Sequence, residues 1–245
     1  MKRALIVLAF IAMFSACGKQ SLVPDTPQEQ YEEAVSKTMS DDARIFTAPP
    51  ASPDPKARYI FYLHGRIIED EGMENAVSPE FGKYEYAEIL SALADRGFLV
   101  ISEARPKDTD IKQYAQKVAD QVRALLKAGV PPGNITVAGA SKGGAITHKT
   151  SSLLHNKDLN FVLLSACGTD YHFGFDIDLV GNVLSVYDYK DNKGAGSCAE
   201  FFAKSKDINR HKEIELKLGL GHGILYKPLE EWIGPTVDWA GGNYK

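Results

Sequence analysis

The stretch that decides the fold reads Gly139-Ala140-Ser141-Lys142-Gly143-Gly144. An apolar run, residues 135–138, precedes it, and a segment with helical character, residues 145–154, follows it. A Gly-x-Ser-x-Gly pattern between a strand and a helix is typical of a sharp, strained turn with the serine at its tip. The residues two before and two after the serine must then have almost no side chain, because strand and helix would otherwise collide. The free N–H groups at the start of the helix would then point toward an oxygen that reacts at this serine.

The composition indicates a single globular domain. The chain has 245 residues, of which 44% are hydrophobic and 24% are charged, enough for a sizeable core. The formal charge of −4 is mild, and the sequence has no basic stripe with interleaved aromatic residues, which argues against nucleic acid as a partner. No group of side chains has the spacing of metal ligands, and the glycine-rich turn lacks the longer phosphate-loop pattern. We therefore expect no metal and no other cofactor.

The first residues have the pattern of an export signal. Two basic residues precede an apolar segment, residues 4–14, that is too short to span a bilayer. The small residues before Cys17 resemble the lipobox of bacterial lipoproteins, in which this cysteine is acylated, and the following Gly18 resembles an outer-membrane sorting signal. The resemblance implies a signal peptide, residues 1–16, and a lipid anchor on Cys17 that holds the protein to the outer membrane, facing the periplasm. An ordinary secretory signal and a secreted protein are the alternative.

Two further features fit an exported chain. Residues 17–56 are predicted to be a tether, with a possible short helix after the capping box at residues 26–29 and a proline-rich spacer behind it. Cys167 and Cys198 each come soon after a predicted strand, and these two strands would be neighbours in the sheet. An even pair of cysteines in an exported protein predicts a disulfide, with two buried thiols as the alternative.

Strand and helix patterns alternate through the rest of the chain. The predicted strands are residues 58–63, 98–104, 134–138, 161–165, 182–187 and 213–218. The predicted helices are residues 84–96, 110–129, 142–155, 197–205 and 229–240. This alternation predicts an α/β fold: a three-layer sandwich with a mostly parallel, six-stranded sheet and helices on both faces. We expect one domain, residues 57–245, with the last strand at an edge of the sheet because its apolar and charged residues alternate.

Polar residues follow three of the predicted strands, at the edge of the sheet where the working groups of such folds gather. The first strand ends in His64-Gly65-Arg66, which resembles the oxyanion-hole segment of esterases and lipases. Gly65 would let the backbone come close to a carbonyl oxygen, so that the backbone N–H groups of Arg66 and Lys142 could donate to the oxyanion. We interpret His64 as a structural residue that braces this loop, because the base of this fold class follows the serine along the chain.

The two later strand ends supply an acid and a base. Asp188 and Asp191 follow the fifth strand; Asp191 stands where the usual hydrolase pattern has its acid, and we favour it, with two plain turn residues as the alternative. The last strand leads to His222, which lies between two glycines that free the loop to swing the imidazole toward the serine. There it could take the hydroxyl proton while the aspartate fixes its tautomer. A capping or surface histidine is the alternative.

The order Ser141, Asp191, His222 is that of the catalytic triad in the α/β-hydrolase superfamily, which the sequence resembles over residues 57–243. The resemblance implies a serine hydrolase that cleaves an ester through an acyl-enzyme, with Ser141 as nucleophile, His222 as base and Asp191 as its orienting acid. The substrate would be a small-molecule or lipid-like ester. The alternative is a non-catalytic envelope lipoprotein of the same fold that binds a partner or a glycan.

Two departures from the superfamily pattern concern the shape of the site. Six strands are predicted instead of eight, and residues 168–181 are too few for the large cap that many members insert there. We therefore expect an open site. The expected wall residues are Tyr187, Tyr189, Phe173 and Phe175.

Overall fold

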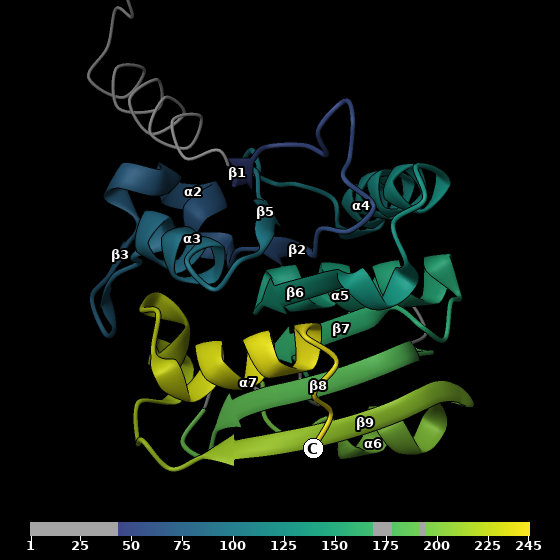
Figure 1. The fold of residues 1–245 in the computed structure, drawn as a ribbon. Coiled ribbons are helices and arrows are strands. Elements are labelled where there is room, and N and C mark those ends of the chain that lie inside the picture. Colours follow the sequence, from purple (N-terminus) through teal and green to yellow (C-terminus); the bar gives the residue numbers. More distant parts are fainter. Residues whose placement is uncertain (1–43, 169–177, 192–194) are drawn as a thin grey trace, which may run out of the picture.

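The computed structural model describes residues 44–168, 178–191 and 195–245. Its main sheet contains β1 (Ile45–Phe46), β2 (Tyr59–Leu63), β5 (Leu99–Ile101), β6 (Ile135–Ala140), β7 (Asn160–Leu164), β8 (Val180–Asp188) and β9 (Asp207–Leu216). The strand order is β1-β5-β2-β6-β7-β8-β9, and every pair is parallel (Figure 1). The predicted fold class is confirmed, and the last strand lies at an edge as expected.

The number of strands differs from the prediction, since the sheet has seven strands and not six. The additional strand, β1, pairs with β5 at the other edge, where the Val100 N–H donates to the Arg44 carbonyl at 2.7 Å. Two residues are too few to show an alternating pattern, so the sequence gives no signal for this strand. The expected start of the domain at residue 57 therefore leaves out part of the sheet. The predicted signal peptide and Cys17 lie outside the described residues.

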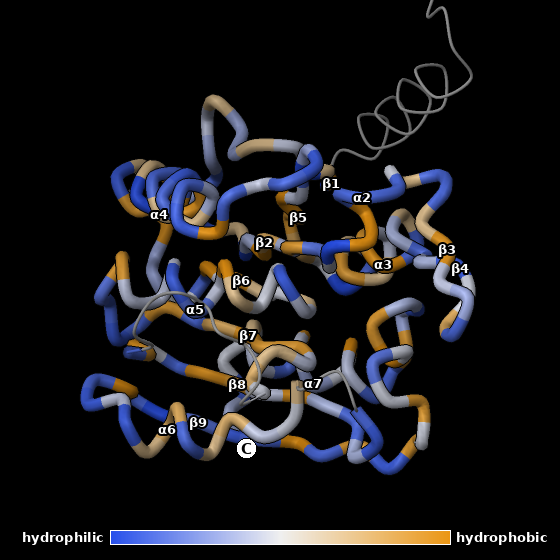
Figure 2. The backbone as a smooth tube through the Cα atoms, turned by 180° about the vertical axis from the view of Figure 1, so that it is seen from behind, coloured by the Kyte–Doolittle hydropathy of each residue, from blue (hydrophilic) through white to orange (hydrophobic). Residues whose placement is uncertain are grey.

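Helices cover both faces of the sheet. The helices α3 (Tyr86–Ala94) and α7 (Glu230–Ala240) pack on one face, and α4 (Ile111–Lys127), α5 (Lys142–Leu154) and α6 (Ala199–Lys204) pack on the other. Side chains of each strand alternate between the two cores, so that in β2 Ile60 and Tyr62 belong to one core and Tyr59, Phe61 and Leu63 to the other. In Figure 2 the interior strand β7 is largely hydrophobic and the edge strand β9 largely hydrophilic.

The longest helix among the described residues illustrates how the local sequence fixes an element. The Asp110 carboxylate caps α4 by accepting the Gln113 N–H at 2.8 Å. The helix then buries one apolar face, made of Ala115, Val118, Ala119, Val122 and Leu125. No helix in the described ranges is both long enough and apolar enough to cross a membrane.

A disulfide joins Cys167 and Cys198, as predicted, with their Cα atoms 4.8 Å apart. Cys167 follows β7 and Cys198 directly precedes α6, so the bridge ties the loops that follow two neighbouring strands. Both residues are buried in the core beneath α5 and α6. His148 of α5 lies beside the bridge, with its Nε2 3.5 Å from the Cys167 sulfur and 3.1 Å from the Ala166 carbonyl oxygen.

The buried His148 should make the protein sensitive to acid. Burial lowers the pKa of its imidazole to about 4, although the hydrogen bond to the Ala166 carbonyl opposes part of this shift. The unfolded chain takes up the same proton near pH 6.5, so it binds more protons than the folded chain between these values. This contribution to the free energy of unfolding is complete above about pH 6.5. It should fall by on the order of 3 kcal/mol as the pH drops to about 4.

Denaturant titrations between pH 4 and 7 measure this dependence in the wild type and in His148→Gln. The variant should show a shallower loss of stability, because Gln does not titrate. Some slope should remain from His64, whose pKa burial also lowers well below the usual value. Equal slopes in the two proteins would show that His148 does not contribute.

Candidate active site

Ser141 lies at the carboxyl end of β6, near the middle of the sheet, and directly precedes α5. Its backbone has φ 52° and ψ −115°, a left-handed conformation that is rare for a residue with a side chain. The Ser141 N–H donates to the Leu164 carbonyl of the neighbouring strand at 3.0 Å, which helps to hold the turn. The predicted sharp turn between strand and helix is therefore present.

The glycines around this turn are required by close backbone contacts. A Cβ atom on Gly139 would lie 2.2 Å from the Gly143 carbonyl oxygen, and one on Gly143 would lie 1.9 Å from the Leu63 carbonyl oxygen. A Cβ atom on Gly144 would lie 2.1 Å from the Ala166 Cβ. The helix α5 thus starts in direct backbone contact with the end of β2. This contact brings the segment after β2 to the side of Ser141.

That segment contains Gly65 and Arg66, which the sequence analysis assigned to a possible oxyanion hole. Gly65 is the N-cap residue of a further helix, α2 (Arg66–Asn75), and a Cβ atom on it would lie 3.8 Å from the Ser141 Cβ. Arg66 and Lys142 are each the first residue of a helix, so their backbone N–H groups have no acceptor within the helix. Both residues line the same cavity as Ser141.

His64 has the bracing geometry that the sequence analysis favoured. The residue is fully buried, its Nε2 accepts the Arg105 backbone N–H at 2.9 Å, and its Nδ1 donates to the Gly65 carbonyl at 2.8 Å. Burial, the nearby Arg105 charge and, more weakly, Lys142 lower the pKa of its imidazole well below the usual value. With both nitrogens engaged, the ring holds the loop after β2 against the loop after β5.

The structure brings Asp191 and His222 together. The Nδ1 atom of His222 lies 2.8 Å from the Asp191 Oδ2 atom, and the carboxylate is completely buried. His222 belongs to a short 3-10 helix, η2 (Gly221–Tyr226), that follows β9. A Cβ atom on Gly221, which has φ 56°, would lie 2.9 Å from the Lys190 carbonyl oxygen, so the glycine before the histidine permits close approach of the two loops.

Asp188, the other carboxylate considered from the sequence, contacts the backbone and not the histidine. Its carboxylate accepts four backbone N–H groups at 2.9–3.0 Å, those of Lys190, Leu218, Gly219 and Gly221. Burial alone would raise the pKa of the Asp188 carboxyl, but these four hydrogen bonds lower it below the usual value. Asp188 therefore fastens the loop after β8 to the loop that carries His222.

Ser141 and His222 line one cavity of about 410 Å³. Its walls are mostly apolar and include Ile67, Phe81, Tyr84, Ala145, Leu225 and Tyr226. The expected wall residues Tyr187 and Tyr189 do not line this cavity, so that prediction is wrong for them. Phe173 and Phe175 lie outside the described residues.

The aromatic wall comes mainly from segments that the sequence analysis missed. Phe81 lies in a small hairpin between β3 (Val77–Ser78) and β4 (Gly82–Lys83). Its ring centroid is 6.5 Å from that of His222 and 5.2 Å from that of Tyr226. The turn sequence Ser78-Pro79-Glu80-Phe81-Gly82, with Gly82 at φ 79°, was the available signal for this hairpin.

The sequence matches no family model, and no curated protein is significantly similar to it. Solved structures nevertheless share the arrangement of strands and helices. SOBER1 from Arabidopsis thaliana is 13% identical, with a TM-score of 0.50, and the match covers 77% of this chain and all of that one. A hyperthermophilic esterase from the archaeon Pyrobaculum calidifontis is 17% identical, with a TM-score of 0.50 and coverage of 89% and 92%.

A third match has the same arrangement of strands and helices. XC6422 from Xanthomonas campestris, an α/β serine hydrolase without a lid, is 13% identical, with a TM-score of 0.50 and coverage of 80% of this chain and 86% of that one. The fold is that of the α/β-hydrolases. In this α/β-hydrolase fold Ser141 lies on the turn after the central strand, and Asp191 and His222 follow the last two strands of the sheet.

Position 143, where α5 contacts the end of β2, should tolerate no residue larger than glycine. In Gly143→Ala the new methyl group would meet backbone atoms of Leu63 and His64, which cannot move without separating strand from helix. We expect this variant to unfold at a markedly lower temperature than the wild type or to fail to fold. Gly133→Ala is the matched control, because a Cβ atom there meets nothing within 4 Å. Similar thermal unfolding of both variants would contradict the close contact.

Proposed function

We propose that the protein is a serine hydrolase that cleaves an ester bond through an acyl-enzyme, with Ser141, His222 and Asp191 as its triad. The observation that carries the proposal is the 2.8 Å contact between Asp191 and His222, in a loop whose histidine lines the same cavity as the strained Ser141. Strain of this kind persists only where the surrounding structure enforces it, and it clusters at active sites. The α/β-hydrolase fold adds support at the level of architecture.

In the first half of the reaction His222 acts as general base. Its Nδ1–H donates to the Asp191 carboxylate, which leaves Nε2 as the nitrogen that takes the Ser141 hydroxyl proton. The serine oxygen attacks the ester carbonyl, and the imidazolium then gives its proton to the leaving alcohol. The buried Asp191 carboxylate fixes the tautomer and stabilises the imidazolium. Water repeats the sequence on the acyl-enzyme and releases the acid.

The developing negative charge on the carbonyl oxygen would be bound by the backbone N–H groups of Arg66 and Lys142. Each is the first N–H of a helix, so the helix dipole adds to the hydrogen bond. Gly65, which directly precedes Arg66, lies beside the serine, since a Cβ atom on it would be 3.8 Å from the Ser141 Cβ. The cavity of about 410 Å³ suits an ester whose acyl or alkyl group is apolar and of moderate size.

We also propose that this activity belongs to the cell envelope. The proposal depends on the sequence pattern around Cys17, which predicts a lipid anchor, and the disulfide between Cys167 and Cys198 is compatible with an oxidising compartment. Metabolic labelling with a palmitate analogue tests it directly. The wild type should incorporate the label, and Cys17→Ser should not. An exported wild type without label would contradict the lipid anchor and favour a secreted protein.

A fluorophosphonate probe tests the nucleophile. The wild type should be labelled and should hydrolyse short-chain p-nitrophenyl esters, and both properties should be lost in Ser141→Ala. Thermal unfolding of the variant should stay near that of the wild type, because Ala keeps the Cβ atom of Ser141 and removes only the hydroxyl oxygen. A folded wild type that neither labels nor hydrolyses any ester would favour a binding protein of the same fold.

Substitution of Asp191 should mainly reduce activity, and substitution of Asp188 should mainly reduce stability. Asp191→Asn should reduce kcat by roughly 10³- to 10⁴-fold, because the amide no longer holds the histidine in the required tautomer. Asp188→Asn should retain more activity but unfold more easily. Its amide NH₂ would replace one of the two carboxylate oxygens, each of which accepts two backbone N–H groups, at a cost on the order of 3 kcal/mol. Kinetics per labelled site and denaturant titration measure the two effects, and a larger kcat loss in Asp188→Asn would reassign the acid.

A further inference from the structure

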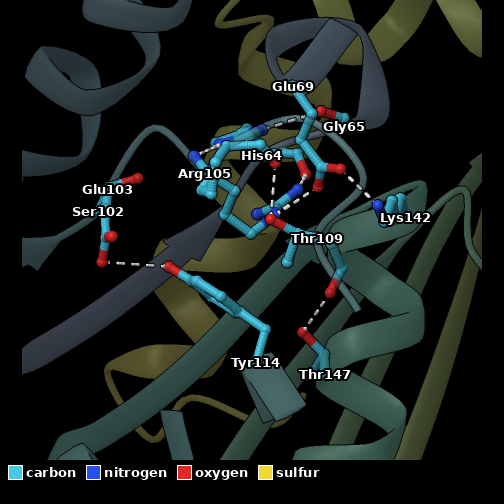
Figure 3. A network of polar contacts seen from close by, with 12 residues as sticks. His64, Gly65, Glu69, Ser102, Glu103, Arg105, Thr109, Tyr114, Lys142 and Thr147 are labelled. Atoms are coloured by element: carbon cyan, nitrogen blue, oxygen red, sulfur yellow. Dashed lines mark hydrogen bonds and ion pairs between the residues drawn. The ribbon is translucent and has the colours of Figure 1, made fainter. Parts of the chain in front are cut away.

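Three charged side chains form a buried cluster beside the proposed site (Figure 3). Glu69 accepts from Arg105 Nε at 2.7 Å through one carboxylate oxygen and from Lys142 Nζ through the other. The side chains of Glu69 and Arg105 are completely buried, and that of Lys142 is 10% exposed. The formal charges sum to one net positive charge. We call these three residues the buried charge cluster.

The cluster connects the strand ends that carry the proposed oxyanion donors. Glu69 lies on α2, one turn after Arg66, and Lys142 begins α5 directly after Ser141. Arg105 comes from the segment after β5, donates through Nη2 to the His64 carbonyl, and offers its backbone N–H to the His64 ring at 2.9 Å. The guanidinium also lies over the Tyr114 ring of α4, 5.4 Å from its centroid. Each hydrogen bond and ion pair of the cluster therefore joins segments that are 36 to 73 residues apart in the sequence.

Stability alone is a poor explanation for such a cluster. Removing three charges from water is costly, and well-packed apolar side chains of similar volume often stabilise a protein as well or better. A net positive charge in the interior adds to this cost. The exposed Lys157–Asp207 pair, with 59% and 34% of its side chains accessible, carries no such cost. The position of the buried charge cluster, between the first residues of α2 and α5, suggests a different role.

We propose that Glu69, Arg105 and Lys142 are positioning residues that fix the separation of the Arg66 and Lys142 N–H groups and place one net positive charge next to the oxyanion. This inference rests on the proposed function. The ester carbonyl is neutral in the ground state and carries negative charge only in the transition state. A fixed positive charge and two fixed donors therefore lower the barrier without tightening substrate binding. Their loss should appear in kcat and not in KM.

The test is Lys142→Met in the full-length chain, which keeps the backbone N–H and the stem of the side chain but removes the ammonium. With p-nitrophenyl butyrate we expect kcat per fluorophosphonate-labelled site to fall roughly 10- to 100-fold, with KM within about two-fold of the wild type. Lys142→Arg restores the charge and should recover most of kcat. Lys157→Met is the matched control and should leave kcat unchanged, since Lys157 pairs with Asp207 on the protein surface.

A transition-state analogue provides a readout that a structural role would not move. An alkyl trifluoromethyl ketone forms an anionic hemiketal with the serine, so its inhibition constant should rise in Lys142→Met by the same factor as kcat falls. Glu69→Asp, which keeps every charge but shortens one link, should show a smaller parallel change. It also serves as the test if Lys142→Met does not fold.

Three outcomes overturn the proposal. Unchanged kcat per labelled site, with only a lower unfolding temperature, would make the buried charge cluster purely structural. A raised KM with unchanged kcat would make Lys142 a substrate-binding residue. A wild type that is folded but neither labelled nor active would overturn the proposed function itself, and only that result does so. Failure of the cluster hypothesis and failure of the hydrolase hypothesis are therefore distinguishable.

Discussion

The rest of the structure depends on the close backbone contact between the start of α5 and the end of β2. Gly143 lies so near the Leu63 and His64 carbonyls that no Cβ atom fits between them. Packing at this distance lets the first residues of two helices, α2 and α5, meet at one point above the sheet. Two helix N-termini that meet provide N–H donors and positive dipole ends for an anion. The backbone contact therefore creates the electrostatic character of the site before any side chain is considered.

The second half of the site depends on Asp188. Its carboxylate accepts N–H groups from its own loop and from the loop after β9, so it fixes the distance between the segments that carry Asp191 and His222. Each hydrogen bond to a charged acceptor contributes about 1.5–3 kcal/mol. Two carboxylates three positions apart thus differ in role because of their surroundings. One is saturated by backbone donors, and the other faces an imidazole.

The sequence allowed the prediction of most strands and helices because their apolar residues recur with clear periods. It also allowed the prediction that Asp191, and not Asp188, contacts His222. Several elements were missed, and for most of them the physical reason is visible. β1 has only two residues, α2 is largely charged with a backbone break at Gly72, and the β3–β4 hairpin is short. The cavity wall around Phe81 and Tyr226 was therefore assigned to the wrong residues. Walls depend on contacts between distant segments, which local patterns do not contain.

Glu69 shows why the missed helix matters most. In the sequence it is one of several acidic residues between positions 69 and 74, and nothing local distinguishes it from its neighbours. In the fold it is completely buried, because α2 turns this one carboxylate toward Arg105 and Lys142. A lysine directly after the serine would usually extend into solvent, yet here its ammonium is held beneath the surface. Solvent would screen the interaction between a surface lysine and an anion. In the buried charge cluster the low dielectric weakens this screening, so the Lys142 ammonium interacts more strongly with an anion at the proposed site.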